Sequence, residues 1–129
     1  RTPALSTIME TLEESIGPET AADFRAVLDS LSTARSDANG LDEVTISLLV
    51  AARNDELLYD ISRWGEDIGL ASKATFSRTK TQLEESGLLD TEKVPIDVGR
   101  PRLRLRLGDD RLETAAPERL AAVATDLLG

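Results

Sequence analysis

The sequence has no cysteine and no histidine among its 129 residues. Their absence excludes disulfide bonds, the usual zinc sites and any nucleophile that histidine would activate. No apolar run approaches the roughly 20 residues that cross a bilayer, and acidic residues throughout the N-terminal segment exclude a signal peptide. We therefore expect a soluble cytoplasmic protein that uses no cofactor and contacts no membrane. Because the chain begins at Arg1 without an initiator methionine, we also expect a piece of a longer protein.

Aromatic residues and lysine are scarce. Aromatic residues make up 3% of the chain, and only three of the 15 basic residues are lysine. An acidic composition with little lysine is typical of halophilic proteins, in which excess carboxylates help to keep the protein in solution. The alternative is an ordinary acidic bacterial protein encoded by a GC-rich genome.

The charge of the chain is unevenly distributed. The net charge is −9, which by itself argues against nucleic acid as a partner. The segment from Ser72 to Arg106, however, contains eight Lys and Arg residues and five Asp and Glu residues, a net charge of +3, so the remainder of the chain carries −12. Positive charge is therefore concentrated in about a quarter of the chain, which could meet phosphate there.

Residues 1–40 predict a helical extension followed by a linker. Apolar residues at helical spacing indicate a first helix, capped by Thr2 and ended by Gly17 and Pro18. A second helix is predicted to begin at Thr20, which together with Asp23 resembles a capping box. Residues 32–40 are rich in Ser, Asp, Asn and Gly, a composition typical of linkers.

Residues 41–107 predict a second unit. Asp42 is a good N-cap for a helix that is apolar almost all round from residue 44 to 52, and which we expect to be buried on several sides. A second apolar stripe covers residues 57–68, and a short break at 69–71 follows. Ser72 then caps a third helix that is predicted to run to Ser86, with Gly87 in the left-handed position that ends helices.

The pattern changes from helical to extended after Gly87. Residues 88–94 predict a strand, residues 95–101 a turn, and the strict alternation of Arg and Leu from 102 to 107 a half-buried strand. The order helix, helix, tight turn, helix, hairpin is that of a winged helix-turn-helix. The predicted fold class is thus mainly α with a small β-hairpin, a winged helix-turn-helix with additional N-terminal and C-terminal helices.

Residues 108–129 predict a C-terminal helix that opens at Pro117. The helices at both ends of the chain carry more apolar surface than a small winged helix needs for its core. Helix-turn-helix proteins commonly use two-fold symmetry, so we predict a homodimer formed by the helices at residues 2–16 and 117–128.

The third helix is the predicted DNA-reading helix. Phe76 and Leu83 share one face and should pack on the preceding helices, whereas Ala74, Arg78 and Thr81 lie opposite. Small and hydroxylated residues suit a helix that enters the major groove, and its first amides could also meet a phosphate. The alternative is that these residues form an ordinary solvated face.

Two roles are possible for Lys80, and two for the arginines of the hairpin. Lys80 stands where a core residue is expected, and its amine could reach phosphate or pair with Glu84. Arg100, Arg102 and Arg104 could contact phosphate or the minor groove, or they could be charges that discourage edge pairing. The predicted DNA-binding residues are, in full, Ser72, Lys73, Thr75, Ser77, Arg78, Lys80, Thr81, Arg100, Arg102 and Arg104.

Three stretches resemble a known family. Residues 71–78 and 83–89 resemble the third helix of many archaeal and bacterial winged-helix regulators. The resemblance of residues 90–103 is more specific to one family. With the acidic composition, these stretches resemble the haloarchaeal TbsP-type transcriptional regulators. The resemblance implies a sequence-specific protein that binds double-stranded promoter DNA, with a further domain N-terminal to this piece.

Two other function classes compete with DNA binding. Some winged helices bind proteins, and the acidic flanks of this chain would suit a basic partner. An enzyme is not expected, because the sequence has no glycine-rich phosphate loop and no nucleophile motif. We therefore predict a DNA-binding transcriptional regulator, with a winged-helix protein-interaction module as the alternative.

Overall fold

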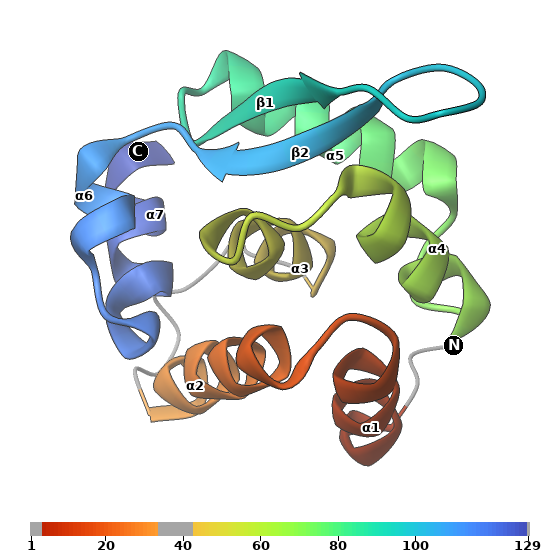
Figure 1. Ribbon diagram of the computed structural model, residues 1–129. Coiled ribbons are helices and arrows are strands. Elements are labelled where there is room, and N and C mark those ends of the chain that lie inside the picture. Colours follow the sequence, from red (N-terminus) through yellow and green to blue (C-terminus); the bar gives the residue numbers. More distant parts are fainter. Residues whose placement is uncertain (1–3, 34–42, 129) are drawn as a thin grey trace.

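A computed structural model of the chain describes residues 4–33 and 43–128. The helices and strands follow one another in a single order (Figure 1), which is α1 (Leu5–Ser15), α2 (Pro18–Thr33), α3 (Glu43–Arg53), α4 (Leu58–Asp67), α5 (Lys73–Glu85), β1 (Leu89–Val94), β2 (Arg102–Leu107), α6 (Asp110–Thr114), a 3-10 helix η1 (Pro117–Arg119) and α7 (Leu120–Leu128). The predicted fold class is confirmed: α3, α4 and α5 form the helix-turn-helix unit, and β1 and β2 form an antiparallel hairpin.

Helix α3 lies at the centre of the molecule. Figure 1 shows α1 and α2 on one side of it, the hairpin and α5 on the opposite side, and α6 and α7 at one end. All nine residues from Val44 to Ala52 are buried, as their apolar character predicts. Because α3 has neighbours on every side, it fixes the relative positions of the other elements.

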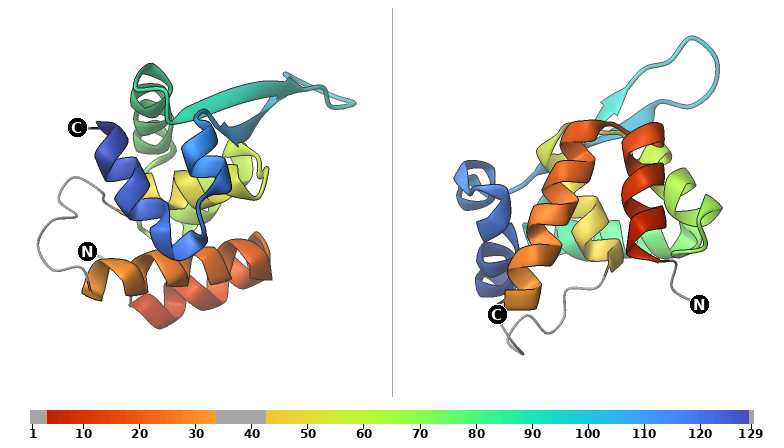
Figure 2. Two further views of the ribbon diagram at one scale, coloured as in Figure 1. Left: turned by 90° about the vertical axis from the view of Figure 1, so that its left-hand side faces the viewer. Right: turned by 90° about the horizontal axis from the view of Figure 1, so that it is seen from below.

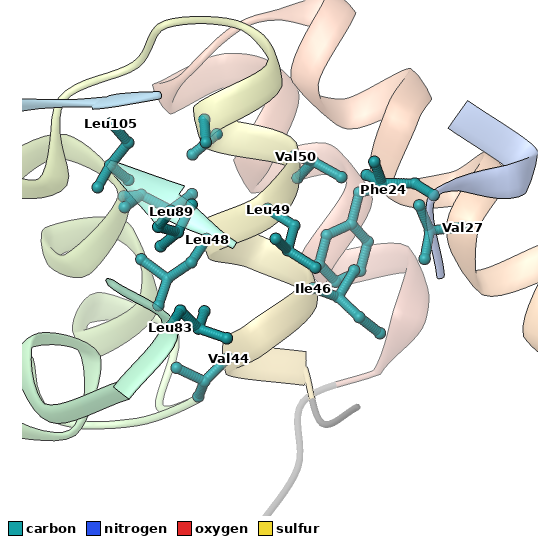
Figure 3. Packing of buried hydrophobic residues seen from close by; sticks show 14 of the residues in the cluster. Phe24, Val27, Val44, Ile46, Leu48, Leu49, Val50, Leu83, Leu89 and Leu105 are labelled. Atoms are coloured by element: carbon teal, nitrogen blue, oxygen red, sulfur yellow. The ribbon is translucent and has the colours of Figure 1, made fainter. Parts of the chain in front are cut away.

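The apolar core is continuous through the molecule. Figure 3 shows Leu48 of α3 directed toward Leu83 and Leu89, whereas Val50 on the same helix lies near Phe24 and Val27 of α2. Burying these side chains removes apolar surface from water, which is the main driving force for folding. The extension predicted at residues 1–40 thus shares a core with the helix-turn-helix unit.

The end helices bury their apolar faces within the chain. Ile8 and Leu12 of α1 and Leu120 and Ala124 of α7 are each at most 3% exposed. These four side chains belong to the apolar stripes that suggested a dimer, yet they are covered by other parts of the same chain, and a homodimer stays a prediction.

The predicted start of α2 is wrong. The helix begins at Pro18, two residues before Thr20, because Pro is favoured in the first turn of a helix, where its missing N–H is not needed. Thr20 and Asp23 consequently lie inside the helix and are buried. Their side chains do not cap it: Thr20 binds Glu56 in the segment that joins α3 to α4, and Asp23 binds Arg53, the last residue of α3.

Two further differences concern the ends of helices. The caps predicted at Thr2 and Asp42 lie outside the described residues. Helix α6 was not predicted, because its five residues are too few to show a helical period. Asp109 caps it by accepting a hydrogen bond from the N–H of Arg111 at 2.8 Å, and the buried Leu112 anchors it to the core.

The hairpin is attached to the helical body along β2. Its register pairs Leu89 with Leu107 and Val94 with Arg102. The N–H of Leu105 donates to the carbonyl of Glu56 at 2.9 Å, and Leu57 forms an isolated bridge with Arg104. The base of the hairpin is therefore held on both edges of β2. In residues 4–33 and 43–128, no helix is long and apolar enough to cross a membrane.

Candidate nucleic-acid interface

The N-terminus of α5 is capped by Ser72 and contacted by a carboxylate from α4. The Ser72 hydroxyl accepts a hydrogen bond from the N–H of Thr75 at 3.1 Å and lies 3.0 Å from the Thr75 hydroxyl. The N–H of Lys73 donates to a Glu66 carboxylate oxygen at 3.3 Å. The cap predicted at Ser72 is confirmed. Two amides of the first turn are therefore already bound, and the expectation that such amides are open to phosphate does not hold for them.

Helix α5 has one buried and one exposed face. Phe76 and Leu83 are buried, at 0% and 5% exposure. Ala74, Ser77, Arg78 and Thr81 are exposed, whereas Thr75 is half-buried. Arg78 has no ion pair or hydrogen bond within the described part of the chain, so its guanidinium N–H donors remain open to solvent.

The wing, defined as β1, β2 and the turn at residues 95–101, extends beyond the helices (Figure 2). Arg100 is exposed in this turn, beside Gly99 at φ +102° and Val98 at 86% exposure. A turn with these exposed side chains presents both a charge and an apolar group, a combination found in segments that contact the DNA backbone or minor groove.

The comparison of this chain with protein families agrees with this geometry. Residues 4–125 match the family described as transcriptional regulator TbsP-like, C-terminal HTH domain. The chain belongs to this family. Comparisons with curated proteins and with solved structures gave no match. The TbsP-like assignment makes the chain the helix-turn-helix domain of a transcriptional regulator family, which indicates DNA-binding regulation.

In this TbsP-like domain, Lys80 pairs with an acid of its own helix. Its amine lies 2.9 Å from a Glu84 carboxylate oxygen, and the other oxygen of Glu84 accepts a hydrogen bond from the Thr91 hydroxyl at 2.9 Å. Burial opposes the charge of Glu84, but the bonds from Lys80 and Thr91 outweigh it and lower the pKa of that carboxyl. The pairing with Glu84 is the second of the two interpretations of Lys80. Through Glu84 and Thr91, this pair also helps to join α5 to β1.

The three wing arginines that were predicted to bind DNA differ in their surroundings. Arg104 forms an ion pair with Glu92 on β1, with 3.3 Å between Nη1 and Oε1. Arg100 has no such partner within the described residues. Arg102 is half-buried, and its guanidinium carbon lies 3.8 Å from the centre of the Tyr59 ring. The sequence therefore grouped three residues that the fold separates into a paired, an open and a stacked arginine.

Tyr59 is the site residue that sequence reasoning missed. It is the only tyrosine of the TbsP-like chain, it lies on α4, and it is 37% exposed. The amine of Lys73 lies 5.7 Å from the centre of the same ring, so cations from α5 and β2 both lie close to this one aromatic side chain. The signal available in the sequence was a single tyrosine outside the apolar stripe of residues 57–68, in a chain with so few aromatic residues.

Metal binding finds no support in this geometry. Within residues 4–33 and 43–128, no group of three or more Asp and Glu side chains lies close enough together to hold a metal ion.

Proposed function

We propose that the chain recognises promoter DNA sequence-specifically, with α5 in the major groove and the wing against the adjacent backbone. The observation that carries the proposal is the exposed face of α5, where Arg78 stands unpaired among the small side chains of Ala74, Ser77 and Thr81. A helix can approach the base edges closely only where its side chains are small, and an arginine there can pair with O6 and N7 of guanine.

The distribution of charge supports the same docking mode. The region from Ser72 to Arg106 carries a net +3, although the whole chain carries −9. Arg100 and Arg102 have no carboxylate partner within the described residues, so their charge is available to phosphate. Contacts to phosphate orient a protein on the duplex, whereas contacts to base edges select the sequence.

The test compares Arg78→Ala with Arg25→Ala. Arg25 is also exposed, but it lies on α2, which Figure 1 shows on the opposite side of α3 from the hairpin. A duplex is first enriched from a random library with the full chain, and affinities are then measured on that duplex and on its scrambled version. Arg78→Ala should weaken binding to the enriched duplex by about 1–3 kcal/mol and relax the preference at one base pair.

The scrambled duplex and the control variant define the alternatives. Arg78→Ala should change binding to the scrambled duplex much less, and Arg25→Ala should leave both affinities at the wild-type level. Wild-type affinity of Arg78→Ala for the enriched duplex would show that α5 does not read the groove. Failure of the wild-type chain to enrich any duplex would favour a protein-interaction module instead.

The proposal includes two copies of the chain on one DNA site. Helix-turn-helix proteins commonly read two half-sites that are related by two-fold symmetry. Light scattering of the chain with the enriched duplex should therefore give the mass of two chains per duplex. A mass of one chain per duplex at saturation would exclude this part of the proposal.

A further inference from the structure

A cleft separates the start of α5 from the wing. It has a volume of about 370 Å³ and is lined by three elements: α4 contributes Tyr59 and Ser62, α5 contributes Lys73 and Ser77, and the wing contributes Arg100 and Arg102. Its lining is largely apolar, and Leu58, Pro101 and Leu103 contribute to it. An apolar lining that also includes three cations suits a ligand that combines a carbon framework with negative charge.

The guanidinium of Arg102 lies over the Tyr59 ring. The guanidinium carbon is 3.8 Å from the ring centre, which is contact distance for an arginine over an aromatic face. Stacking covers one face of the planar guanidinium but leaves the N–H donors along its edge able to bind an oxyanion. Because a neighbouring ring restricts an otherwise flexible side chain, Arg102 would lose less conformational entropy on binding an oxyanion.

The cleft keeps positive charge that the chain does not neutralise. The amine of Lys73 is 4.0 Å from a Glu66 carboxylate oxygen, a weak and exposed ion pair. Neither Arg100 nor Arg102 forms an ion pair within the described residues, in contrast to Arg104 on the same strand, which is bound to Glu92. Two of the three cations of the cleft therefore have no carboxylate partner within the described residues.

We propose that this cleft binds a phosphodiester segment of the DNA backbone, and that Tyr59 is a positioning residue which presents Arg102 to the phosphate. The inference rests on the proposed function and adds to it a contact from α4, the helix that precedes the DNA-reading helix. The sugars of the backbone match the apolar part of the lining, and its phosphates match the cations. A backbone strand reaches the cleft because the cleft opens between the two elements that flank DNA in this docking mode.

The experiment measures binding to the enriched and scrambled duplexes at several salt concentrations. The variants are Tyr59→Phe, Tyr59→Leu, Arg102→Ala and the double variant Tyr59→Leu/Arg102→Ala. Arg106→Ala is the matched control, because Arg106 is an exposed arginine on the same strand that does not line the cleft. Thermal unfolding of each variant shows whether the fold is kept.

Loss of the ring should weaken binding to both duplexes equally. We expect Tyr59→Leu to lower affinity roughly 3- to 10-fold, the scale of one immobilised side chain, and Tyr59→Phe to restore wild-type affinity. Arg102→Ala should reduce the salt slope by about one unit, and Tyr59→Leu should shift the slope in the same direction. Arg106→Ala should change the affinity and the slope less than Arg102→Ala does.

The double variant distinguishes positioning from direct contact. If Tyr59 acts through Arg102, Tyr59→Leu should cause no further loss of affinity in the Arg102→Ala background. An equal loss in both backgrounds, or wild-type binding by Tyr59→Leu, would overturn the inference while leaving the function of α5 intact. If instead Arg78→Ala and Arg102→Ala both bind DNA as the wild type does, the proposed function itself fails.

Discussion

Glu56 is a half-buried carboxyl in the segment that joins α3 to α4. Burial raises its pKa above the usual 4.5, the hydrogen bond from Thr20 acts in the opposite direction, and the nearby charges of Asp60, Glu19 and Asp55 raise the pKa further. A carboxyl whose pKa is raised by folding binds its proton more readily in the folded state. It therefore favours folding below pH 4.5, and this contribution is lost as the pH rises through the folded pKa.

We predict that Glu56→Gln stabilises the fold at neutral pH. The amide oxygen of glutamine can still accept the hydrogen bond from Thr20, whose oxygen lies 3.0 Å from the carboxylate, but it carries no charge to oppose burial. Urea unfolding at pH 7 should give a higher midpoint for the variant than for the wild type. The gain should disappear below pH 4.5, where Glu56 itself is protonated, and a gain that is the same at both pH values would refute the electrostatic cause.

Single residues also show where sequence reasoning reaches its limit. Lys80 stands four residues before Glu84 on one helix, so the sequence allowed both an ion pair and a reach toward phosphate. The Thr91 hydroxyl, which also binds Glu84, belongs to the next element, and only the packing of β1 against α5 brings it there. Likewise, the stacking of Arg102 on Tyr59 joins α4 to β2, and no local pattern determines how a hairpin lies on a helix.

At the scale of elements, α4 and α5 meet at a glycine. A Cβ atom on Gly65 would overlap Cε2 and Cζ of the buried Phe76 ring, so the two helices can cross this closely only because the side chain is absent. Gly65→Ala should force the helices apart and destabilise the fold by about 1–3 kcal/mol, the usual cost of overpacking a core.

Chemical unfolding of Gly65→Ala and of Gly65→Ala/Phe76→Leu tests this contact. The smaller leucine makes room for the methyl group, so the double variant should lose less stability than the sum of the two single variants. DNA affinity should fall in Gly65→Ala, since the angle of α5 relative to the wing changes. Additive losses of stability would show that Gly65 and Phe76 do not constrain each other.

Most elements could be predicted because their signals are local. The nearly continuous apolar run indicated that α3 is buried, and apolar periodicity indicated the faces of α4 and α5. Ser72 and Gly87 marked the ends of α5, and the alternation of Arg and Leu indicated β2. The start of α2 was missed because the local sequence does not show whether Thr20 and Asp23 cap a helix or bind a neighbouring segment. The partners Glu56 and Arg53 that decided between these roles are distant in the sequence.

At the scale of the whole molecule, charge is divided between two regions of opposite sign. Residues 72–106 carry +3 and the remainder carries −12. The acidic remainder repels both itself and DNA, and dissolved salt screens this repulsion as well as the attraction between DNA and the cations. The two effects oppose each other, in contrast to a uniformly basic DNA-binding domain.

This division predicts two responses to salt. The free energy of unfolding should rise as KCl is added, because self-repulsion of the acidic surface is screened. DNA affinity should fall with salt less steeply than in a basic winged helix that makes as many phosphate contacts. Denaturation and binding curves over a range of KCl concentrations measure both, and a steep loss of binding toward molar salt would contradict the prediction.

The attachment of β2 to the segment after α3 has a consequence for motion. The Leu105 amide is hydrogen-bonded to the carbonyl of Glu56 and belongs to a residue that is fully buried, whereas the turn from Asp97 to Pro101 is exposed throughout. Deuterium should therefore replace the Leu105 proton only when the surrounding core opens, but should reach the amides of the turn almost at once. We therefore expect the base of the hairpin to exchange with the core, and its turn to adjust to the shape of a target while the helices keep their packing.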